Sequence, residues 1–330
     1  MVLERKCGSL KITTIGSFPP CGGDIQNAIQ EVIALQRRCD IDILSDGEQR
    51  MDMIGYFSSA IPGLDFKNGL SSIKGKIKSM PNIGDFSKVK DLKFIKSLVP
   101  ESEIKISITG PVTLGFMCSF GGVSAPYSDM RDKKLYVDLV EPLRQLVTEL
   151  SRLGAYVQID EPGLSQGFME PVEAVRLIDS VATHCVYDKT SVHVCGNLRT
   201  YDLIGHLLKL KNIGILSHAF AGETERGNIE LVSRKSFSEC GKRLGLGCIA
   251  VTPTKTDAVD KPNEVADLIR RIRKKLGEDR IAYLHPDCGL RASPTNVVEK
   301  ILQNLKLGME ESKREPRTNT PRANDGEAQL

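Results

Sequence analysis

The stretch YVQIDEP at residues 156–162 decides the fold. Its apolar, β-branched residues give way to acidic ones and a proline, which is typical of a buried strand that ends at the rim of a sheet. Seven further segments are predicted as strands on similar grounds, at residues 11–18, 41–48, 104–110, 190–195, 214–220, 244–250 and 281–288. Amphipathic stretches with apolar residues three and four apart separate the strands, at about residues 24–38, 132–153, 171–183, 200–209, 228–242, 262–276 and 294–307. Eight parallel strands with helical returns predict the α/β class and a closed (β/α)8 TIM barrel rather than an open sheet.

One segment does not fit the repeat. Residues from about 53 to 100 follow the second predicted strand and are too long for a single returning helix. Within this insertion, Asn68-Gly69 is flanked by alternating polar and apolar residues and predicts a hairpin turn. Insertions after barrel strands lie on the face that carries the active site, so we expect this one to form a wall or lid there. We predict a barrel domain over residues 1–308 and a disordered tail over 309–330, which lacks periodicity.

The composition excludes several classes of partner. Lys and Arg total 45 against 42 Asp and Glu, a formal charge of +3, and no block of like charge occurs. A nucleic-acid or membrane partner is therefore not expected. The N-terminus lacks the apolar core of a signal peptide and no run of about 18 apolar residues occurs, so we predict a cytoplasmic protein. The nine cysteines form no C-x-x-C pair, which does not suit a disulfide framework.

Unusual polar residues gather at the C-terminal ends of the predicted strands. They are Ser17, Glu48, Thr109, Asp160, Glu161, His193, Cys195 and Cys288. A barrel presents side chains to a substrate from these strand ends. This distribution predicts an active site at one end of the barrel.

A metal site is predicted at one part of that rim. His193 and Cys195 are two apart on a strand, so both side chains point to one face and can chelate one ion. Cys288 would add a second thiolate and Glu223, after the sixth predicted strand, a carboxylate. This donor set favours zinc, since soft sulfur ligands select against magnesium and calcium. The alternative is a buried His and Cys that bind no metal.

Such a centre predicts alkylation of a thiol substrate. A zinc ion bound by thiolates can hold a substrate thiol as the nucleophilic thiolate. We hypothesise that the substrate sulfur enters by displacing the carboxylate of Glu223.

A second group predicts an amino-acid substrate. Glu48 and Asp160 would attract an ammonium group, and Ser17, in a turn before two prolines, could bind a carboxylate. One alternative is that the two acids pair with local arginines such as Arg50. Another is general acid–base catalysis, which the spacing does not exclude.

Seven motifs, in order along the chain, carry a family resemblance. They are TTIGSFP (13–19), GEQRMDM (47–53), ITGPVT (108–113), VQIDEPGL (157–164), HVC (193–195), GETERGNIEL (222–231) and PDCGL (286–290). The chain resembles the catalytic C-terminal domain of cobalamin-independent methionine synthase, and among its members the short, stand-alone archaeal type. The resemblance implies a zinc-bearing (β/α)8 barrel that methylates L-homocysteine to L-methionine. It implies catalytic zinc ligands at His193, Cys195, Glu223 and Cys288, and homocysteine contacts at Ile15 (backbone), Ser17, Glu48 and Asp160.

Two positions depart from the family pattern, and the first of them affects the expected donor. Where the family has a histidine that protonates the folate leaving group, this chain has Val251, which cannot give a proton. We therefore expect a methylated corrinoid, such as methylcobalamin or a corrinoid protein, rather than methyltetrahydrofolate. The second departure is His285, where the family commonly has Asn, and the sequence does not assign its effect.

Two other functions remain open at the level of sequence. One is zinc-dependent alkyl transfer to another thiol, such as coenzyme M, which the predicted ammonium site disfavours. The other is a metal-binding barrel without catalysis, which the four retained ligands disfavour. The remaining candidates His184, Cys185 and Cys248 are interpreted as core residues, His206 as ordinary, and His218 as a pocket or ligand-supporting residue.

Overall fold

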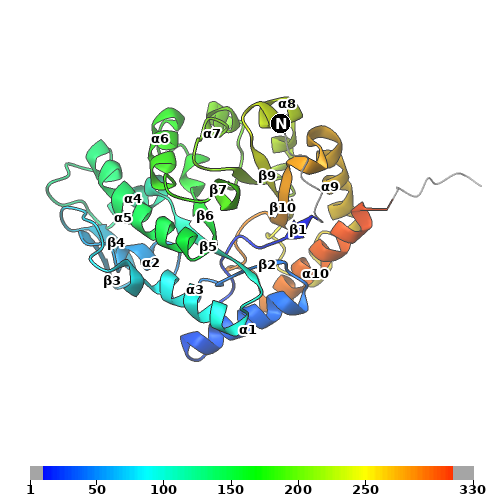
Figure 1. Ribbon diagram of the computed structural model, residues 1–330, viewed down its shortest axis with the longest axis horizontal. Coiled ribbons are helices and arrows are strands. Elements are labelled where there is room, and N and C mark those ends of the chain that lie inside the picture. The colour runs from blue at the N-terminus through cyan, green and yellow to red at the C-terminus, as the bar shows by residue number, and fades with distance from the viewer. Residues whose placement is uncertain (1–9, 315–330) are drawn as a thin grey trace, which may run out of the picture.

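The computed structural model describes residues 10–314, which form a parallel barrel surrounded by helices (Figure 1). The barrel strands are β1 (Lys11–Ile12), β2 (Ile43–Ser45), β5 (Glu103–Thr109), β6 (Tyr156–Asp160), β7 (Thr190–Val194), β8 (Ile215–Ala219), β9 (Arg243–Ile249) and β10 (Ile281–Pro286). Their spatial order is β1-β10-β9-β8-β7-β6-β5-β2, with every pairing parallel. Single bridges between Thr13 and Ile43 and between Ser17 and Gly47 join β1 to β2 and close the ring. The predicted TIM barrel is confirmed.

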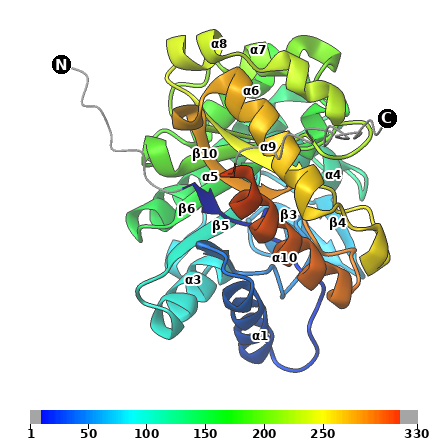
Figure 2. The same ribbon diagram turned by 90° about the vertical axis from the view of Figure 1, so that its right-hand side faces the viewer.

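The helices lie outside the barrel, and Figure 2 shows α9 and α10 packed side by side. They are α1 (Ile25–Arg38), α3 (Ser87–Leu98), α4 (Pro111–Ser119), α5 (Lys133–Arg152), α6 (Pro171–Val181), α7 (Leu203–Leu207), α8 (Arg234–Glu239), α9 (Pro262–Leu276) and α10 (Thr295–Ser312). Helix α5 illustrates the local rules: the Asp132 side chain accepts the N–H of Lys134 at its start, and leucines three and four apart face the core.

Three helical regions differ from the prediction. The single helix predicted over 228–242 is wrong: a 3₁₀ segment, Arg226–Leu231, precedes α8, because Ser233 accepts the N–H of Ser236 and starts a new helix. Helix α7 is shorter than predicted, since a 3₁₀ turn with two left-handed residues precedes it. Helix α4 was not predicted, because PVTLGFMCS is apolar all round and shows no amphipathic period.

The segment predicted as an insertion contains two parts. The first holds α2 (Gly55–Ser58), an antiparallel hairpin of β3 (Leu64–Lys67) and β4 (Leu70–Ile73), and a 3₁₀ turn at Ile83–Asp85. Asn68 and Gly69 have φ of 53° and 76°, so the predicted hairpin turn is confirmed as type I′. The second part, α3, is the ordinary returning helix between the paired strands β2 and β5. The inserted structure therefore ends before Ser87.

The C-terminal helix passes the predicted start of the tail. Helix α10 continues to Ser312 because Met309 is buried against the core, so residues 309–312 are helical. Most of the predicted tail, 315–330, lies outside the described residues. Within residues 10–314, no helix combines the length and apolarity needed to cross a membrane. The eight cysteines of this part are all free thiols, as the sequence predicted.

Candidate metal centre and substrate site

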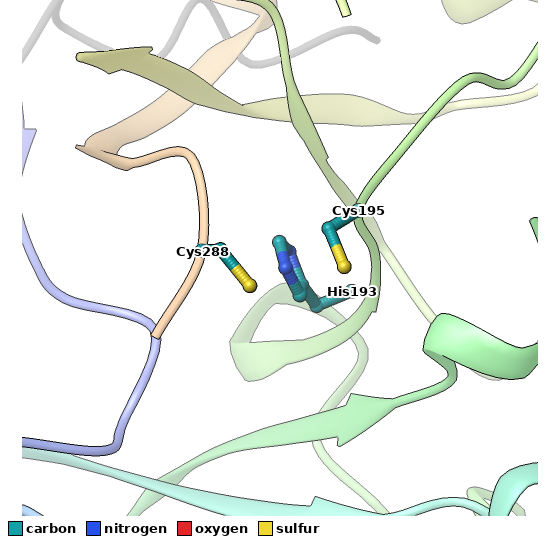
Figure 3. A group of neighbouring side chains, drawn as sticks. All are labelled: His193, Cys195 and Cys288. Carbon is teal, nitrogen blue, oxygen red and sulfur yellow. The ribbon is translucent and has the colours of Figure 1, made fainter. Parts of the chain in front are cut away.

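Three of the four predicted metal ligands meet at one end of the barrel. His193 is on β7, Cys195 is the first residue after that strand, and Cys288 is in the segment after β10 (Figure 3). One ligand atom from each lies within 4.8 Å of the others. His193 and Cys195 are two residues apart and share a face because of strand alternation, whereas Cys288 reaches them because β10 ends near the same rim.

The buried imidazole of His193 has one nitrogen free for a ligand. Its Nδ1 lies 3.0 Å from Ser217 Oγ, and its buried Nε2 has no hydrogen-bond partner. Burial lowers the pKa of His193 well below its ordinary value, with smaller contributions from His285 and His218, so the ring is neutral. A neutral histidine with an unpaired, buried Nε2 beside two sulfurs fits a metal ion.

The two sulfurs interact strongly with each other. The Cys195 thiol donates toward Cys288 and lowers the pKa of Cys288 to about 7, although burial opposes this shift. The same hydrogen bond raises the pKa of Cys195. A neutral imidazole with a thiol and a readily formed thiolate is a donor set that suits zinc.

Glu223 does not join this cluster. Its side chain is exposed, in the segment that follows β8. The first residues of this segment, Phe220, Ala221 and Gly222, donate their N–H groups to the Asp287 carboxylate. Val194 pairs in register with His218, so the next residue of β8, Ala219, lies beside Cys195. Alanine has no ligand atom, so β8 itself adds no fourth ligand at this position. The assignment of Glu223 as a ligand stays a prediction.

Glu48 is buried in an ion pair that sequence analysis missed. Its Oε1 accepts from Lys88 Nζ at 2.8 Å and from Ser107 Oγ at 3.0 Å. Lys88 Nζ also lies 3.0 Å from Asp46 Oδ2, so one buried cation faces two carboxylates. The suggested pairing with Arg50 is wrong, because Arg50 is bound to Asp91.

Asp160 and the backbone of Ile15 are held by one amide. Gln158 Nε2 donates to Asp160 Oδ1 at 2.7 Å and to the Ile15 carbonyl at 2.8 Å, while Gln158 Oε1 accepts from Lys105 Nζ at 2.7 Å. Burial, and next the charge of Glu48, raise the pKa of Asp160 well above its usual value. Burial likewise lowers the pKa of Lys105 to about 7. Both predicted contacts are thus fixed by the same side chain.

Ser17 lies against the segment that carries Cys288. The Ser17 carbonyl accepts the N–H of Leu290 at 2.9 Å, and a Cβ on Gly289 would lie 2.2 Å from Ser17 Oγ. Gly289 therefore makes room for the serine hydroxyl beside the metal cluster.

The two predicted groups form one site. Asp160 pairs in register with His193, and its charge acts on Cys195. Glu48 acts on Asp160 in the same way. Together with the contact between Ser17 and Gly289, these interactions bring the predicted amino-acid contacts to the edge of the metal cluster.

The other rim residues have structural roles. Glu161 accepts the N–H groups of Val112 and Thr113 and caps α4, and burial raises the pKa of Glu161 to about 7. Thr109 Oγ1 donates to the Met53 carbonyl and fastens the inserted segment. Of the residues predicted in the core, Cys248 is buried and Cys185 half-buried, but His184 is exposed because α6 ends before it.

A hollow of about 550 Å³ lies between the inserted hairpin and the barrel rim. Its walls include Leu70 at the hairpin, Met117 on α4, Phe120 just after that helix, and Pro162 and Phe168 after β6. The hairpin therefore forms a wall of this hollow, and its role as a wall or lid over the active site stays a prediction.

Sequence reasoning missed the residues that support the site: Lys88, Lys105, Ser107, Gln158 and Ser217. Four of them are polar positions inside buried strands, and that unusual placement was a usable signal. Lys88 lies on the amphipathic helix α3 and gave no such signal.

A TIM barrel with a histidine and two cysteines at the C-terminal ends of its strands defines a candidate enzyme with a thiolate metal centre. Residues 20–309 match the family model described as "Cobalamin-independent synthase, Catalytic domain", and the chain belongs to this family. The resemblance drawn from the motifs is confirmed.

Named relatives agree with this family, and a solved structure has the same fold. The methionine synthase of Methanothermobacter marburgensis is 32% identical, over 88% of this chain and 89% of the relative. The 5-methyltetrahydropteroyltriglutamate–homocysteine methyltransferase of Blochmanniella pennsylvanica is 29% identical over 89% of this chain but only 41% of its own length. A B12-independent methionine synthase from Shewanella sp. W3-18-1, solved with selenomethionine, has a TM-score of 0.76 at 22% identity, covering 93% of this chain and 98% of that one.

Proposed function

We propose that this chain is a zinc-dependent methyltransferase that converts L-homocysteine to L-methionine. The observation that carries the proposal is the orphaned Nε2 of His193 beside the sulfurs of Cys195 and Cys288, at the edge of a group of buried acids. The names of the relatives, methionine synthase and homocysteine methyltransferase, support the same reaction.

The acids at the rim are proposed to bind the substrate ammonium. Lys88 carries one positive charge against the carboxylates of Asp46 and Glu48, which leaves this buried group one negative charge when both are ionised. Asp160 adds a further carboxylate, and Gln158 holds it beside the Ile15 carbonyl. An ammonium group would relieve the repulsion between these acids and supply donors to the carbonyl.

Ser17 is proposed to bind the substrate carboxylate. Its position against Gly289 sets the distance between that carboxylate and Cys288, so an amino acid anchored at both ends would direct its side-chain sulfur toward the metal cluster.

The residues present fit a zinc ion held by His193, Cys195 and Cys288. When bound, zinc supplies a Lewis acid that favours the thiolate form of a substrate thiol at neutral pH. With only these three residues as protein ligands, the ion would keep an open position for the substrate sulfur. The chain's own part is to orient His193 through Ser217 and to bring the substrate sulfur to the two cysteines.

We propose a methylcorrinoid as the methyl donor. Transfer of the methyl group from cobalt to sulfur uses the electron pair of the thiolate and leaves cobalt(I), which requires no proton. A folate leaving group would need a proton, and Val251, just after β9, cannot donate one. The apolar hollow under the hairpin offers a surface for a large donor near the rim.

Methionine formation tests both parts of the proposal. Zinc-loaded protein is incubated with homocysteine and, separately, methylcobalamin or methyltetrahydrofolate. Methionine is expected from methylcobalamin and to be lost in Cys288→Ala, while Cys240→Ala, an exposed cysteine, serves as the matched control. Full activity of Cys288→Ala would contradict the metal centre. Efficient turnover of methyltetrahydrofolate without corrinoid would contradict the donor.

A further inference from the structure

A chain of hydrogen bonds in the barrel interior ends on His193. Ser217 Oγ lies 3.0 Å from His193 Nδ1 and 3.0 Å from His285 Nε2, and His285 Nδ1 lies 2.8 Å from the Pro286 carbonyl. The three side chains are buried. We propose that His285 is a positioning residue, which acts through Ser217 to hold His193 in the tautomer that leaves Nε2 free for the metal. The inference rests on the proposed metal centre.

The position of each proton follows from the Pro286 carbonyl, at the end of this series of hydrogen bonds. The carbonyl of Pro286 only accepts, so His285 Nδ1 carries the hydrogen. His285 is buried, and a neutral ring that donates Nδ1–H to Pro286 has Nε2 as an acceptor for the Ser217 hydroxyl, 3.0 Å away. The oxygen of Ser217 then accepts from Nδ1–H of His193. This arrangement leaves His193 Nε2 unprotonated, in agreement with its lack of a hydrogen-bond partner.

The contact between Ser217 and His285 crosses strand β9, where glycines pair with both residues. His285 is on β10 and Ser217 on β8, with β9 between them. In register, Ser217 pairs with Gly245 and His285 pairs with Gly247. A Cβ on Gly245 would lie 3.1 Å from Ser217 Cβ and 2.6 Å from the Tyr283 ring. The absence of a side chain at Gly245 leaves this space to Ser217 and to the Tyr283 ring.

Loss of His285 would free the serine hydroxyl. Without an acceptor on β10, Ser217 can rotate its hydrogen toward His193 Nδ1, which favours the tautomer protonated on Nε2. That proton would face Cys195 and Cys288 and compete with the metal. Loss of such an outer hydrogen bond typically weakens metal binding by about 10- to 100-fold.

Matched substitutions at residue 285 test the proposal. His285→Phe keeps a planar ring but removes the acceptor, whereas His285→Gln places an amide oxygen near the position of Nε2. Two quantities are measured in each variant. The first is the His193 tautomer in metal-free protein, from ¹⁵N chemical shifts, and the second is the zinc Kd, from competition with a chromophoric chelator.

We expect His285→Phe to raise the fraction of His193 protonated on Nε2 and to weaken zinc binding by about 10- to 100-fold. His285→Gln should restore both quantities to within about threefold of the unchanged chain. Ser217→Ala, which removes only the hydroxyl oxygen, should also weaken zinc binding. Adding His285→Phe to Ser217→Ala should cause no further loss of zinc affinity, because both substitutions act through one hydrogen-bond series.

Two results would overturn the proposal. One is an unchanged tautomer and Kd in folded His285→Phe. The other is equal weakening in His285→Phe and His285→Gln, which would indicate packing alone. If the unchanged chain bound no zinc while His285→Phe still shifted the tautomer, the metal centre would fail and the hydrogen-bond series would stand.

Discussion

Replacement of Lys88 by Met tests the buried charge group behind the substrate site. The Lys88 side chain is 0% exposed, and its ammonium contacts Asp46 at 3.0 Å and Glu48 at 2.8 Å, with the Tyr56 ring 4.3 Å away. Met fills a similar volume but leaves two buried carboxylates without a cation. Removing one partner of a buried ion pair costs about 3–5 kcal/mol. For a chain of 330 residues, with an unfolding entropy of about 0.7 kcal/mol/K, we expect the melting temperature to fall by roughly 4–7 °C.

The effect should depend on pH with a definite sign. Lys88 opposes the rise that burial causes in the pKa of Asp46, which lies at about 6. In Lys88→Met this pKa rises further, so the variant takes up a proton as the pH falls and loses its uncompensated charge. The destabilisation should therefore be largest above pH 7 and shrink toward pH 5.

Thermal unfolding followed by circular dichroism measures both effects. Lys90→Met is the matched control on the same helix, since the pair of Lys90 and Asp85 is 56% and 65% exposed and is worth at most about 1 kcal/mol. A melting temperature for Lys88→Met within about 2 °C of the control would refute the reasoning.

Three further predictions concern the turn, a buried acid and the uncertain ligand. Gly69→Ala should lower the free energy of unfolding, measured by thermal unfolding, by about 1 kcal/mol, because Gly69 has φ of 76°. Space is not the cause, since nothing lies within 4 Å of the added Cβ. Gly75→Ala, with equal space and no left-handed φ, is the control and should be nearly neutral. Burial raises the pKa of Glu161 to about 7, so the folded chain gains stability as the pH falls from 7.5 to 5, and Glu161→Gln should flatten that part of the melting-temperature profile. Glu223→Gln should keep the zinc Kd within about threefold, as Glu223 is exposed and outside the cluster; a loss as large as that of Cys288→Ala would make Glu223 a ligand.

Local patterns allowed most of the fold to be predicted from the sequence. The eight strands and the Asn68-Gly69 turn depend on neighbours in the chain, and both predictions are confirmed. Helix α4 was missed because its residues are apolar on all faces, and the end of α10 was placed early because the burial of Met309 depends on tertiary packing.

The site was predictable where residues lie at strand ends. His193, Cys195 and Cys288 meet because the barrel brings those ends together. The pairing of Glu48 with Lys88, 40 residues away, had no local signal, and neither did the reach of His285 across β9. Glu223 was predicted as a ligand from its place just after a strand and from the family motif. Its actual position depends on the path of the segment after β8, whose N–H groups bind Asp287.

The most direct test of the proposed centre is zinc X-ray absorption spectroscopy with and without homocysteine. With His193, Cys195 and Cys288 as ligands, the free protein should show two sulfur neighbours around zinc, and homocysteine should raise the number to three. A count that stays at two while methionine is formed would contradict delivery of the substrate sulfur to this centre.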